Sequence, residues 1–178
     1  MDWINRPMEQ KEINRELFRS FERRQVVDQC WRKEAGQWVI RRDPFIDQWS
    51  EADYAFLVTC LRRTIAEGGV VFGAFCAGEL KGFASVEGIP LGSQNQYLDL
   101  TCLHVSEELR GKGLGRQLFT MAADWARCRG AEKLYISGHS AVETQAFYRA
   151  MGCREAEEPS LEHVKKEPFD CQLEYQLI

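Results

Sequence analysis

The residues most able to do chemistry form a seven-residue turn of three glycines and three cations, Arg110-Gly111-Lys112-Gly113-Leu114-Gly115-Arg116. This stretch, called the glycine turn below, lies between an apolar strand-like run and a strongly amphipathic helical one. Glycine lets backbone N–H groups approach an anion closely, and the start of a helix adds unpaired N–H donors and a positive dipole end. The glycine turn therefore predicts a binding site for a phosphate compound.

Two nucleotide-binding motifs explain the glycine turn less well. A Walker loop, G-x-x-x-x-G-K-[ST], needs a hydroxyl residue after its lysine, but Gly113 follows Lys112. A dinucleotide fingerprint, G-x-G-x-x-G, needs a glycine where Arg116 stands and an acidic residue at the end of the next strand, whereas Glu132 precedes that strand. A turn without function is also disfavoured, because three cations at a helix start are an unusual way to build one.

The residues around the glycine turn resemble the central motif of the GCN5-related N-acetyltransferase (GNAT) superfamily. That motif is written Gln/Arg-x-x-Gly-x-Gly/Ala, and Arg110, Gly113 and Gly115 fill its three defined places. The resemblance begins upstream at Leu100, in the strand-like run that leads into the turn. A short signature of this kind needs the support of a second motif.

A second motif follows in the expected order. Residues 143–153, Glu-Thr-Gln-Ala-Phe-Tyr-Arg-Ala-Met-Gly-Cys, resemble the family helix A-x-x-F-Y-x-x-x-G-F, with Cys153 in place of the final Phe. Together the motifs cover about residues 70–157, while residues 1–69 match no subfamily that we can name. The resemblance implies one N-acetyltransferase domain over residues 1–178, with its coenzyme-binding core at about 70–157.

The resemblance also implies a fold class, a donor and a reaction. We expect an α/β (α+β, mixed-sheet) fold, with a central, mostly antiparallel sheet flanked by helices and a β-α-β unit around the glycine turn. Acetyl-CoA is the expected acetyl donor, without a metal. The expected activity is direct attack of a primary amine of a small molecule or peptide in a ternary complex. The alternative is a non-catalytic module that binds acyl-CoA for sensing or assembly.

The resemblance assigns coenzyme binding to the glycine turn and to the strand before it. The backbone from about Gly111 to Arg116 would bind the pyrophosphate, and the end of the strand, which carries a bulge, would pair with the pantetheine arm. Ser140 is a weaker site candidate that is better explained as the cap of the next helix. The implied residues are Leu103, His104, Val105, Arg110, Gly111, Lys112, Gly113, Leu114, Gly115, Arg116, Ser140, Phe147 and Tyr148.

Tyr148, Asp99 and Glu87 are the candidate catalytic residues. The resemblance points the Tyr148 hydroxyl at the coenzyme sulfur as general acid, and helical spacing places it off an apolar stripe of Ala146, Phe147 and Ala150. Asp99 lies where some relatives that acetylate protein lysines carry a catalytic glutamate, and Glu87 ends the preceding strand. Either carboxylate could accept a proton through water, although a carboxylate at a strand end is more often a solvated charge.

Composition limits which partners, cellular locations and metal or redox sites are expected. The 178 residues have a net charge of −4, which disfavours a nucleic-acid partner. No run of about 18 apolar residues and no signal-peptide core occur, so we expect a cytoplasmic protein without a membrane partner. Seven scattered cysteines predict reduced, mostly buried thiols rather than a zinc or redox site. A homodimer stays open, since nothing in the sequence demonstrates one.

Hydrophobic periodicity predicts the elements before the glycine turn. Two apolar stripes predict helices in the first third of the chain, one with Ile13 and Phe18 and one with Val27 and Cys30. A short strand at 37–40 would end at Asp43-Pro44. Further elements are a helix capped by Ser50, a hairpin of 70–75 and 80–87, and a strand at 97–105.

The same residue patterns predict the helices and strands that follow the glycine turn. We expect a helix that ends at Gly130, a strand at 133–137, a helix at 142–151, a strand at 153–157, and a hairpin loop at 162–169. In the last segment, apolar residues from Cys171 to Leu177 alternate with Gln172, Glu174 and Gln176. This alternation predicts a strand with one buried and one solvent-facing side.

Overall fold

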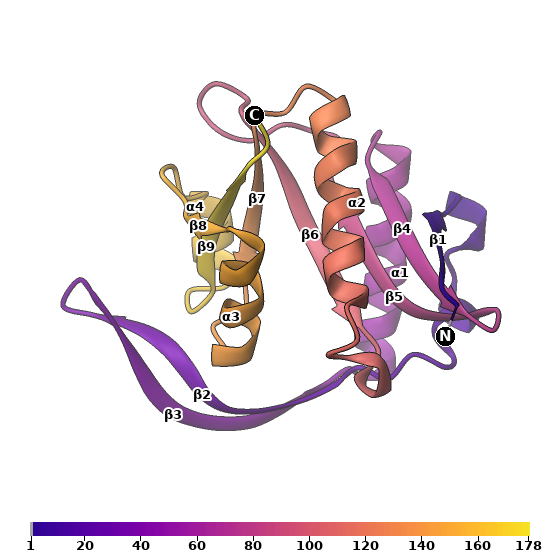
Figure 1. Ribbon diagram of the computed structural model, residues 1–178, viewed down its shortest axis with the longest axis horizontal. Helices are drawn as coiled ribbons and strands as arrows, with labels where there is room; N and C mark the ends of the chain where they lie inside the picture. The colour runs from indigo at the N-terminus through magenta and orange to yellow at the C-terminus, as the bar shows by residue number, and fades with distance from the viewer. Residues whose placement is uncertain (1) are drawn as a thin grey trace.

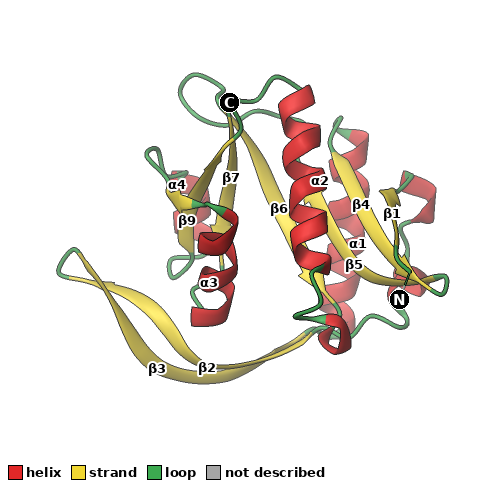
Figure 2. Cartoon of the chain, viewed as in Figure 1, coloured by secondary structure: helices red, strands yellow, loops and turns green. Residues whose placement is uncertain are grey.

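Nine strands and four α-helices build the computed structural model, which describes residues 2–178 (Figures 1 and 2). The strands are β1 (Ile4–Pro7), β2 (Arg24–Glu34), β3 (Gln37–Gln48), β4 (Val70–Cys76), β5 (Glu79–Val86), β6 (Tyr97–Val105), β7 (Lys133–Gly138), β8 (Arg154–Glu155) and β9 (Cys171–Gln176). The helices are α1 (Glu51–Ala66), α2 (Leu114–Cys128), α3 (Val142–Met151) and α4 (Leu161–Lys166). None of these helices is long and apolar enough to cross a membrane.

Seven strands form one sheet in the order β1-β4-β5-β6-β7-β9-β8, and β2 and β3 form a separate hairpin. Neighbouring strands are antiparallel except β6 and β7. These two pair only over Tyr97–Asp99 and Lys133–Tyr135, although β6 continues to Val105. Figure 1 shows them diverging beyond this contact. The mostly antiparallel sheet confirms the predicted fold class, and the divergence leaves the end of β6 with one free edge.

Helices cover both faces of the sheet (Figure 2). Leu118 of α2 and Tyr148 of α3 belong to one buried cluster, whereas Leu61 of α1 belongs to a second cluster on the opposite face. The short helix α4 lies on the same face as α1, where the His163 ring is 5.3 Å from that of Tyr135. Any residue of β6 therefore points either toward α2 and α3 or toward α1 and α4.

Several predicted elements are confirmed close to their predicted bounds. Helix α1 begins at a capping box, in which Ser50 Oγ accepts the Asp53 N–H at 3.2 Å and Asp53 Oδ2 accepts the Ser50 N–H at 2.7 Å. Strand β6 and helix α3 have the predicted bounds. Helix α2 follows the glycine turn, and Gly130 after it takes the left-handed conformation, with φ 82°.

The helices predicted in the first third of the chain are wrong. Ile13 and Phe18 are buried as expected, but in and beside short 3-10 helices. Val27 and Cys30 lie in β2, where the pairing register with β3 shifts at Asp28. The bulge places two residues of β3, Asp43 and Pro44, opposite Asp28 alone. Val27 and Cys30 on either side of this irregularity are both buried, and their separation of three residues imitates the spacing of a helix.

The predicted end of the third strand at Pro44 is also wrong. Strand β3 continues beyond Pro44, because the register passes from the Val27–Phe45 pair to the Gln29–Arg42 pair. Pro44 therefore lies in the bulge itself, where its missing N–H leaves no ladder hydrogen bond unmade. The resulting hairpin runs across one end of the molecule toward α3 (Figure 1).

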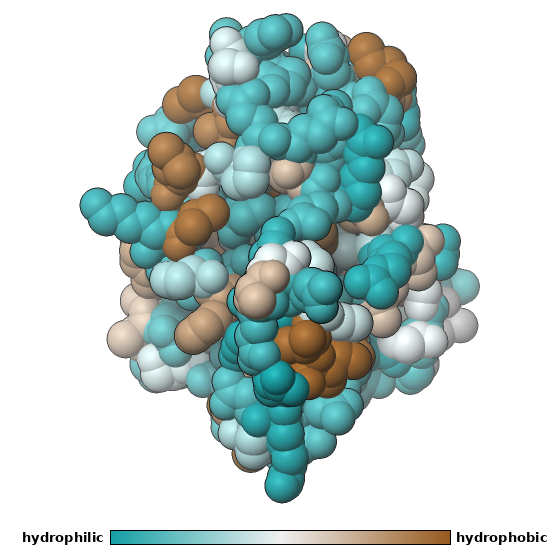
Figure 3. All heavy atoms as spheres, turned by 90° about the vertical axis from the view of Figure 1, so that its left-hand side faces the viewer, coloured by the Kyte–Doolittle hydropathy of each residue, from teal (hydrophilic) through white to brown (hydrophobic). Residues whose placement is uncertain are grey.

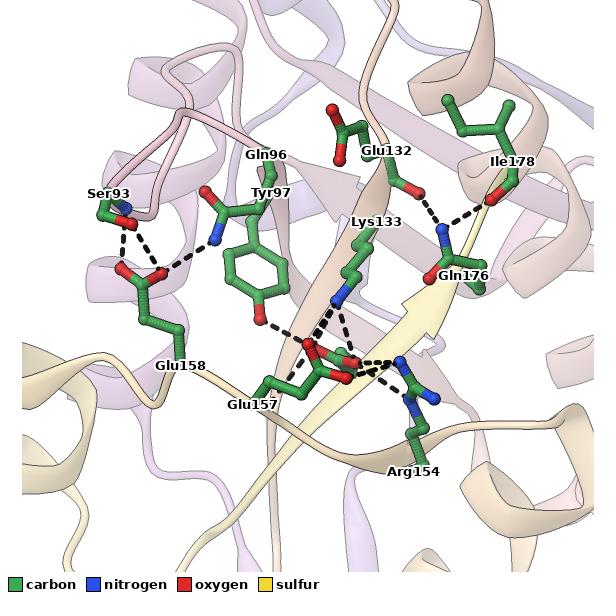
Figure 4. Close-up of polar contacts among 11 residues, drawn as sticks. Ser93, Gln96, Tyr97, Glu132, Lys133, Arg154, Glu157, Glu158, Gln176 and Ile178 are labelled. Carbon is green, nitrogen blue, oxygen red and sulfur yellow. Dashed lines mark hydrogen bonds and ion pairs between the residues drawn. The ribbon is translucent and has the colours of Figure 1, made fainter.

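The last strand lacks the predicted solvent-facing side. Gln172 and Glu174 are 9% and 0% exposed, because β9 lies inside the sheet between β7 and β8. The Glu174 carboxylate accepts hydrogen bonds from the Tyr97 hydroxyl at 2.6 Å, from Lys133 Nζ at 3.1 Å and from Arg154 Nε at 2.9 Å. Figure 4 shows Lys133 and Arg154 reaching into this network from two strands. The buried carboxylate of β9 is thus linked to donors on three other strands, β6, β7 and β8.

Other predictions near the C-terminus also change. The expected hairpin loop at 162–169 contains α4, which begins where Ser160 Oγ accepts the His163 N–H at 3.4 Å. The strand predicted at 153–157 shortens to Arg154–Glu155. On α3, Ala146 and Ala150 are exposed, so the predicted apolar stripe is not the buried side of this helix. The buried side carries Tyr148 instead.

The thiols and the surface fit the expectations in part. All seven cysteines are free, with Cys30, Cys153 and Cys171 buried and Cys128 exposed. Figure 3 shows one face of the molecule, on which hydrophobic residues gather in several separate patches within a hydrophilic surface. Among residues 2–178, no group of three His, Cys, Asp or Glu side chains is placed to hold a metal ion.

Candidate active site

A cleft of about 680 Å³ opens beside the free edge of β6. Its walls come from the end of β6, the glycine turn, the start of α2, helix α3 and the start of the β2–β3 hairpin. The lining residues are Arg23, Gln25, Val26, Leu103, His104, Val105, Leu109, Arg110, Gly111, Gly113, Gly115, Arg116, Glu143, Thr144, Phe147 and Tyr148. The cleft thus joins residues from both sequence motifs.

The glycine turn has the backbone geometry of an anion site. Gly111 and Gly113 have φ angles of 75° and 87°, which favour glycine over other residues, and an added Cβ at either would meet no atom within 4 Å. Gly113 is the N-cap of α2, and Gln117 N–H makes the first bond of the helix, to the Gly113 carbonyl at 3.2 Å. The first N–H groups of α2 therefore remain available to an anion in the cleft.

The positive charge of the cleft comes from three lining arginines, Arg23, Arg110 and Arg116. Arg110 Nε donates to the Val105 carbonyl at 3.1 Å, and burial lowers the pKa of its guanidinium. Arg23, which the sequence patterns did not single out, is 8% exposed and pairs with Asp47 of β3 at 2.6 Å. Burial also lowers the pKa of Arg23. Its site is built by the hairpin, which sequence periodicity had assigned to helix, so no local signal pointed to it.

Lys112, Leu114 and Ser140 are placed differently from the other candidate coenzyme residues. Lys112 is exposed outside the cleft lining, and the Leu114 side chain is 1% exposed in the core under α2. The Ser140 hydroxyl accepts a hydrogen bond from Arg32 at 2.7 Å, and the N-cap of α3 is Ala141. The predicted helix cap at Ser140 is therefore wrong, because the serine anchors the hairpin instead.

The predicted bulge of β6 is present. The pairing with β5 shifts between Val86 opposite Leu100 and Ser85 opposite Cys102. Beyond the bulge, Leu103, His104 and Val105 line the cleft along the free edge of the strand. Backbone groups on such an edge can pair with an extended ligand as a further strand would.

His104 is a neutral, packed side chain in this cleft. Its ring lies 4.9 Å from that of Trp49 and 5.4 Å from that of Phe83. Burial lowers its pKa to about 3, and the charges of Arg23 and Arg110 act in the same direction. The expectation that His104 lines a pocket agrees with this geometry.

Tyr148 reaches the cleft from the buried side of α3. Its side chain is 8% exposed and contacts the rings of Phe147 and Phe119 edge-on, at 5.3 and 6.5 Å. An added Cβ on Gly138 would lie 3.3 Å from the Tyr148 ring, so a glycine in β7 makes room for it. Burial raises the pKa of the phenol, which keeps it protonated.

Glu87 and Asp99 are neighbours across β5 and β6, outside the cleft lining. The Glu87 N–H donates to the Asp99 carbonyl at 2.9 Å. Glu87 Oε1 accepts hydrogen bonds from Thr64 of α1 at 2.8 Å and from Thr101 at 3.1 Å. Asp99 Oδ2 lies 2.6 Å from Nε2 of His163 on α4. Both carboxylates therefore face the side of the sheet opposite α2.

The acetyltransferase (GNAT) family profile matches residues 11–153, which is most of the chain. This chain belongs to the GNAT acetyltransferase family. The match includes both motifs and extends over the β2–β3 hairpin, which the two motifs do not reach. The family resemblance inferred from the glycine turn and the Tyr148 helix is confirmed.

Named members of the GNAT family are similar to this chain. Streptothricin acetyltransferase of Streptomyces lavendulae is 42% identical over 77 residues, which are 42% of this chain and 39% of that protein. The matched part is thus less than half of that relative. The crystal structure of nourseothricin acetyltransferase has a TM-score of 0.68 and 20% identity, over 98% of this chain and 96% of that one. A candidate streptothricin acetyltransferase of Bacillus anthracis, solved with acetyl coenzyme A, has a TM-score of 0.72 and 14% identity, over 98% and 96%.

Proposed function

We propose that this GNAT protein transfers an acetyl group from acetyl-CoA to a primary amine of a small cationic molecule. The observation that carries the proposal is the shared cleft, in which the open glycine turn and the Tyr148 side chain face one volume. An anion site alone would suit many phosphate ligands. A buried phenol at the other end of the cleft supplies the proton that an acyl transfer to nitrogen must return to the leaving thiolate.

The donor would lie along the cleft from the glycine turn to Tyr148. The N–H groups at the start of α2 and the cations Arg110 and Arg116 would bind the pyrophosphate. The pantetheine arm would pair with the free edge of β6 at Leu103–Val105. A backbone N–H of the same edge would stabilise the oxyanion that forms on the thioester carbonyl.

The transfer itself makes one bond, breaks one bond and moves protons at nitrogen and at sulfur. The ammonium first loses one proton, and the freed nitrogen lone pair bonds to the acetyl carbon. The carbon–sulfur bond breaks, the thiolate takes a proton from Tyr148, and the second proton lost by nitrogen restores the phenol. An exposed thiol has a pKa of about 8.5 and a phenol one of about 10, so proton donation to the thiolate is uphill in water. Burial raises the pKa of Tyr148 further, so the step needs a comparable rise in the pKa of the coenzyme thiol within the same cleft.

The acceptor would approach from the sheet face opposite α2. Asp99 and Glu87 lie on that face next to the point where β6 and β7 separate, and Asp170 lies after α4 with a carboxyl whose pKa burial raises. Asp99 is the proposed proton acceptor, through a water molecule, with Glu87 as the alternative. Acidic side chains on this face suit a substrate that arrives as an ammonium ion.

The names of similar proteins suggest the first acceptor to examine. Two of them are named for streptothricin, so we propose an amine of streptothricin as the acceptor. The test measures free thiol released from acetyl-CoA in the presence of streptothricin, a polyamine, an amino sugar and a lysine peptide. We expect streptothricin to accelerate release most. If the protein binds acetyl-CoA tightly but no amine accelerates thiol release, the result would contradict the proposed enzymatic activity and favour an acyl-CoA-binding module.

A further inference from the structure

A histidine of α4 holds the carboxylate that we propose as the base. His163 Nε2 lies 2.6 Å from Asp99 Oδ2, although the two residues are 64 positions apart in the sequence. The Asp99 side chain is 6% exposed and that of His163 is 22% exposed. With Asp99 ionised, the Nε2–H group donates to Oδ2, and the other ring nitrogen faces the Ser160 hydroxyl at 3.0 Å.

The position of His163 does not depend on Asp99. The Ser160 N–H donates to the Tyr135 hydroxyl at 2.9 Å, and Ser160 Oγ caps α4 by accepting the His163 N–H. Tyr135 is 1% exposed and is the parallel-sheet partner of Asp99 on β7. The start of α4 is therefore fixed to the strand beside Asp99. His163 orients the carboxylate, rather than following it.

The second oxygen of Asp99 has no partner in the described structure. Asp99 Oδ1 is fully buried and accepts no hydrogen bond from residues 2–178. A buried carboxylate oxygen without a donor is costly, so such groups usually meet a water molecule or a ligand. Asp99 lies in the last residue pair of β6 and β7 before the strands separate. Oδ1 is thus an unused acceptor at the root of the proposed acceptor site.

We propose that His163 is a positioning residue, which occupies Asp99 Oδ2 and leaves Oδ1 to receive the proton of the acceptor ammonium. This role rests on the acetyl transfer proposed above. An ammonium nitrogen has no lone pair, so this proton passes through one water to Oδ1 before the carbon–nitrogen bond forms. A purely structural pairing would instead hold α4 on the sheet without affecting turnover.

The charges around His163 predict a pH signature. The hydrogen bond to Asp99 raises the pKa of His163, burial opposes this, and Glu162 and Lys166 of α4 have smaller, opposite effects. Glu87, Asp170 and Tyr135 also lie on this side of the sheet, and burial raises the pKa of Asp170 and that of Tyr135. Above the His163 pKa the imidazolium charge is lost, so Asp99 becomes a better proton acceptor and kcat should rise.

The experiment compares His163→Ala and His163→Gln with Lys166→Gln, an exposed charge change on the same helix. We expect His163→Ala to lower kcat for the best amine at least tenfold, with KM for acetyl-CoA within twofold of wild type, because His163 is outside the cleft lining. His163→Gln, which keeps a donor for Oδ2, should recover most of kcat but lose the added rise with pH. Lys166→Gln should match wild type in kcat at a fixed pH, with only a small upward shift of the His163 titration midpoint.

A second measurement keeps the inference testable if an alanine variant folds poorly. The chain has three histidines, so the imidazole signal of His163 can be assigned by its loss in His163→Gln. Its titration midpoint should exceed 6.5 in wild type and fall in Asp99→Asn. An unchanged kcat in folded His163→Ala, or an unchanged midpoint in Asp99→Asn, overturns the role of His163. A wild-type protein that acetylates no amine overturns the proposed function, and this role with it.

Discussion

Arg110 Nε donates a hydrogen bond to the Val105 carbonyl at 3.1 Å, which joins the first cation of the glycine turn to the last residue of β6. The contact spans the 3-10 helix Glu107–Leu109 between strand and turn. It sets the anion site at a defined distance from the free strand edge. The two parts of the proposed coenzyme site are therefore coupled by one side chain.

Arg110 should matter more for coenzyme affinity than its neighbour Lys112. Arg110 lines the cleft and Lys112 does not, so Arg110→Gln removes a charge-assisted contact worth about 1.5–3 kcal/mol. We expect the Kd for acetyl-CoA, measured by calorimetry, to rise about tenfold or more in Arg110→Gln. Lys112→Gln carries the same charge change and should stay within about threefold, which is about 0.7 kcal/mol. Equal increases in Kd for the two variants would show that coenzyme affinity depends only on the net charge of the turn.

Two glycines of the same turn should differ in their tolerance of substitution by alanine. Gly113 has φ 87°, so Gly113→Ala strains the backbone by roughly 1–2 kcal/mol and shifts the N–H groups at the start of α2. Gly115 lies inside α2, and an added Cβ would meet Phe147 at 3.4 Å, an ordinary contact. We expect weaker acetyl-CoA binding and a lower Tm for Gly113→Ala only. Equal behaviour of both variants would contradict the turn geometry.

Tyr148→Phe should separate proton donation from packing. The variant keeps the buried ring against Gly138 and Phe119 and removes only the hydroxyl. We expect kcat for the best amine to fall by about 10²-fold, in the range of general acid catalysis, with little change in KM for acetyl-CoA. Steady-state kinetics with a thiol reagent measure both constants. Undiminished turnover would assign Tyr148 to packing alone.

Glu174 should be a major source of acid-sensitive stability. Burial by itself would raise its pKa, but hydrogen bonds from Tyr97, Lys133 and Arg154 hold the pKa below the ordinary value. A lowered pKa contributes stability above the unfolded-state pKa of about 4.3, and this contribution is lost as the pH falls through the folded-state pKa. Glu174→Gln breaks a buried ion pair and should cost about 3–5 kcal/mol at pH 7.

The measurement for Glu174 is urea unfolding at pH 7 and at pH 3.5. Wild type should lose free energy of unfolding between these conditions, and Glu174→Gln should lose less, because its side chain does not titrate. Glu157→Gln is the matched control, since this carboxylate contacts the same Lys133 and Arg154 but is exposed. Its effect at pH 7 should stay below about 1 kcal/mol. Similar costs for both variants would argue against the buried network.

The sequence by itself determined the family, the bounds of β6 and α3, and the position of the glycine turn at the start of α2. These features are local: the positive φ angles of Gly111 and Gly113, the start of α2 and the Tyr148 helix each follow from residues within about one or two turns of chain. Interactions between residues close in the chain produce characteristic residue spacings, which can be recognised in the sequence.

Tertiary structure decided where these local elements meet. The bulge at Asp28 made β2 imitate a helix in sequence, and long-range pairing with β3 overrode that spacing. The same hairpin placed Arg23 in the cleft. Asp99 met His163 across 64 positions only because Ser160 and Tyr135 fix α4 beside β6. Contacts between distant segments depend on strand register and on burial from both faces, and neither leaves a periodic signal in the chain.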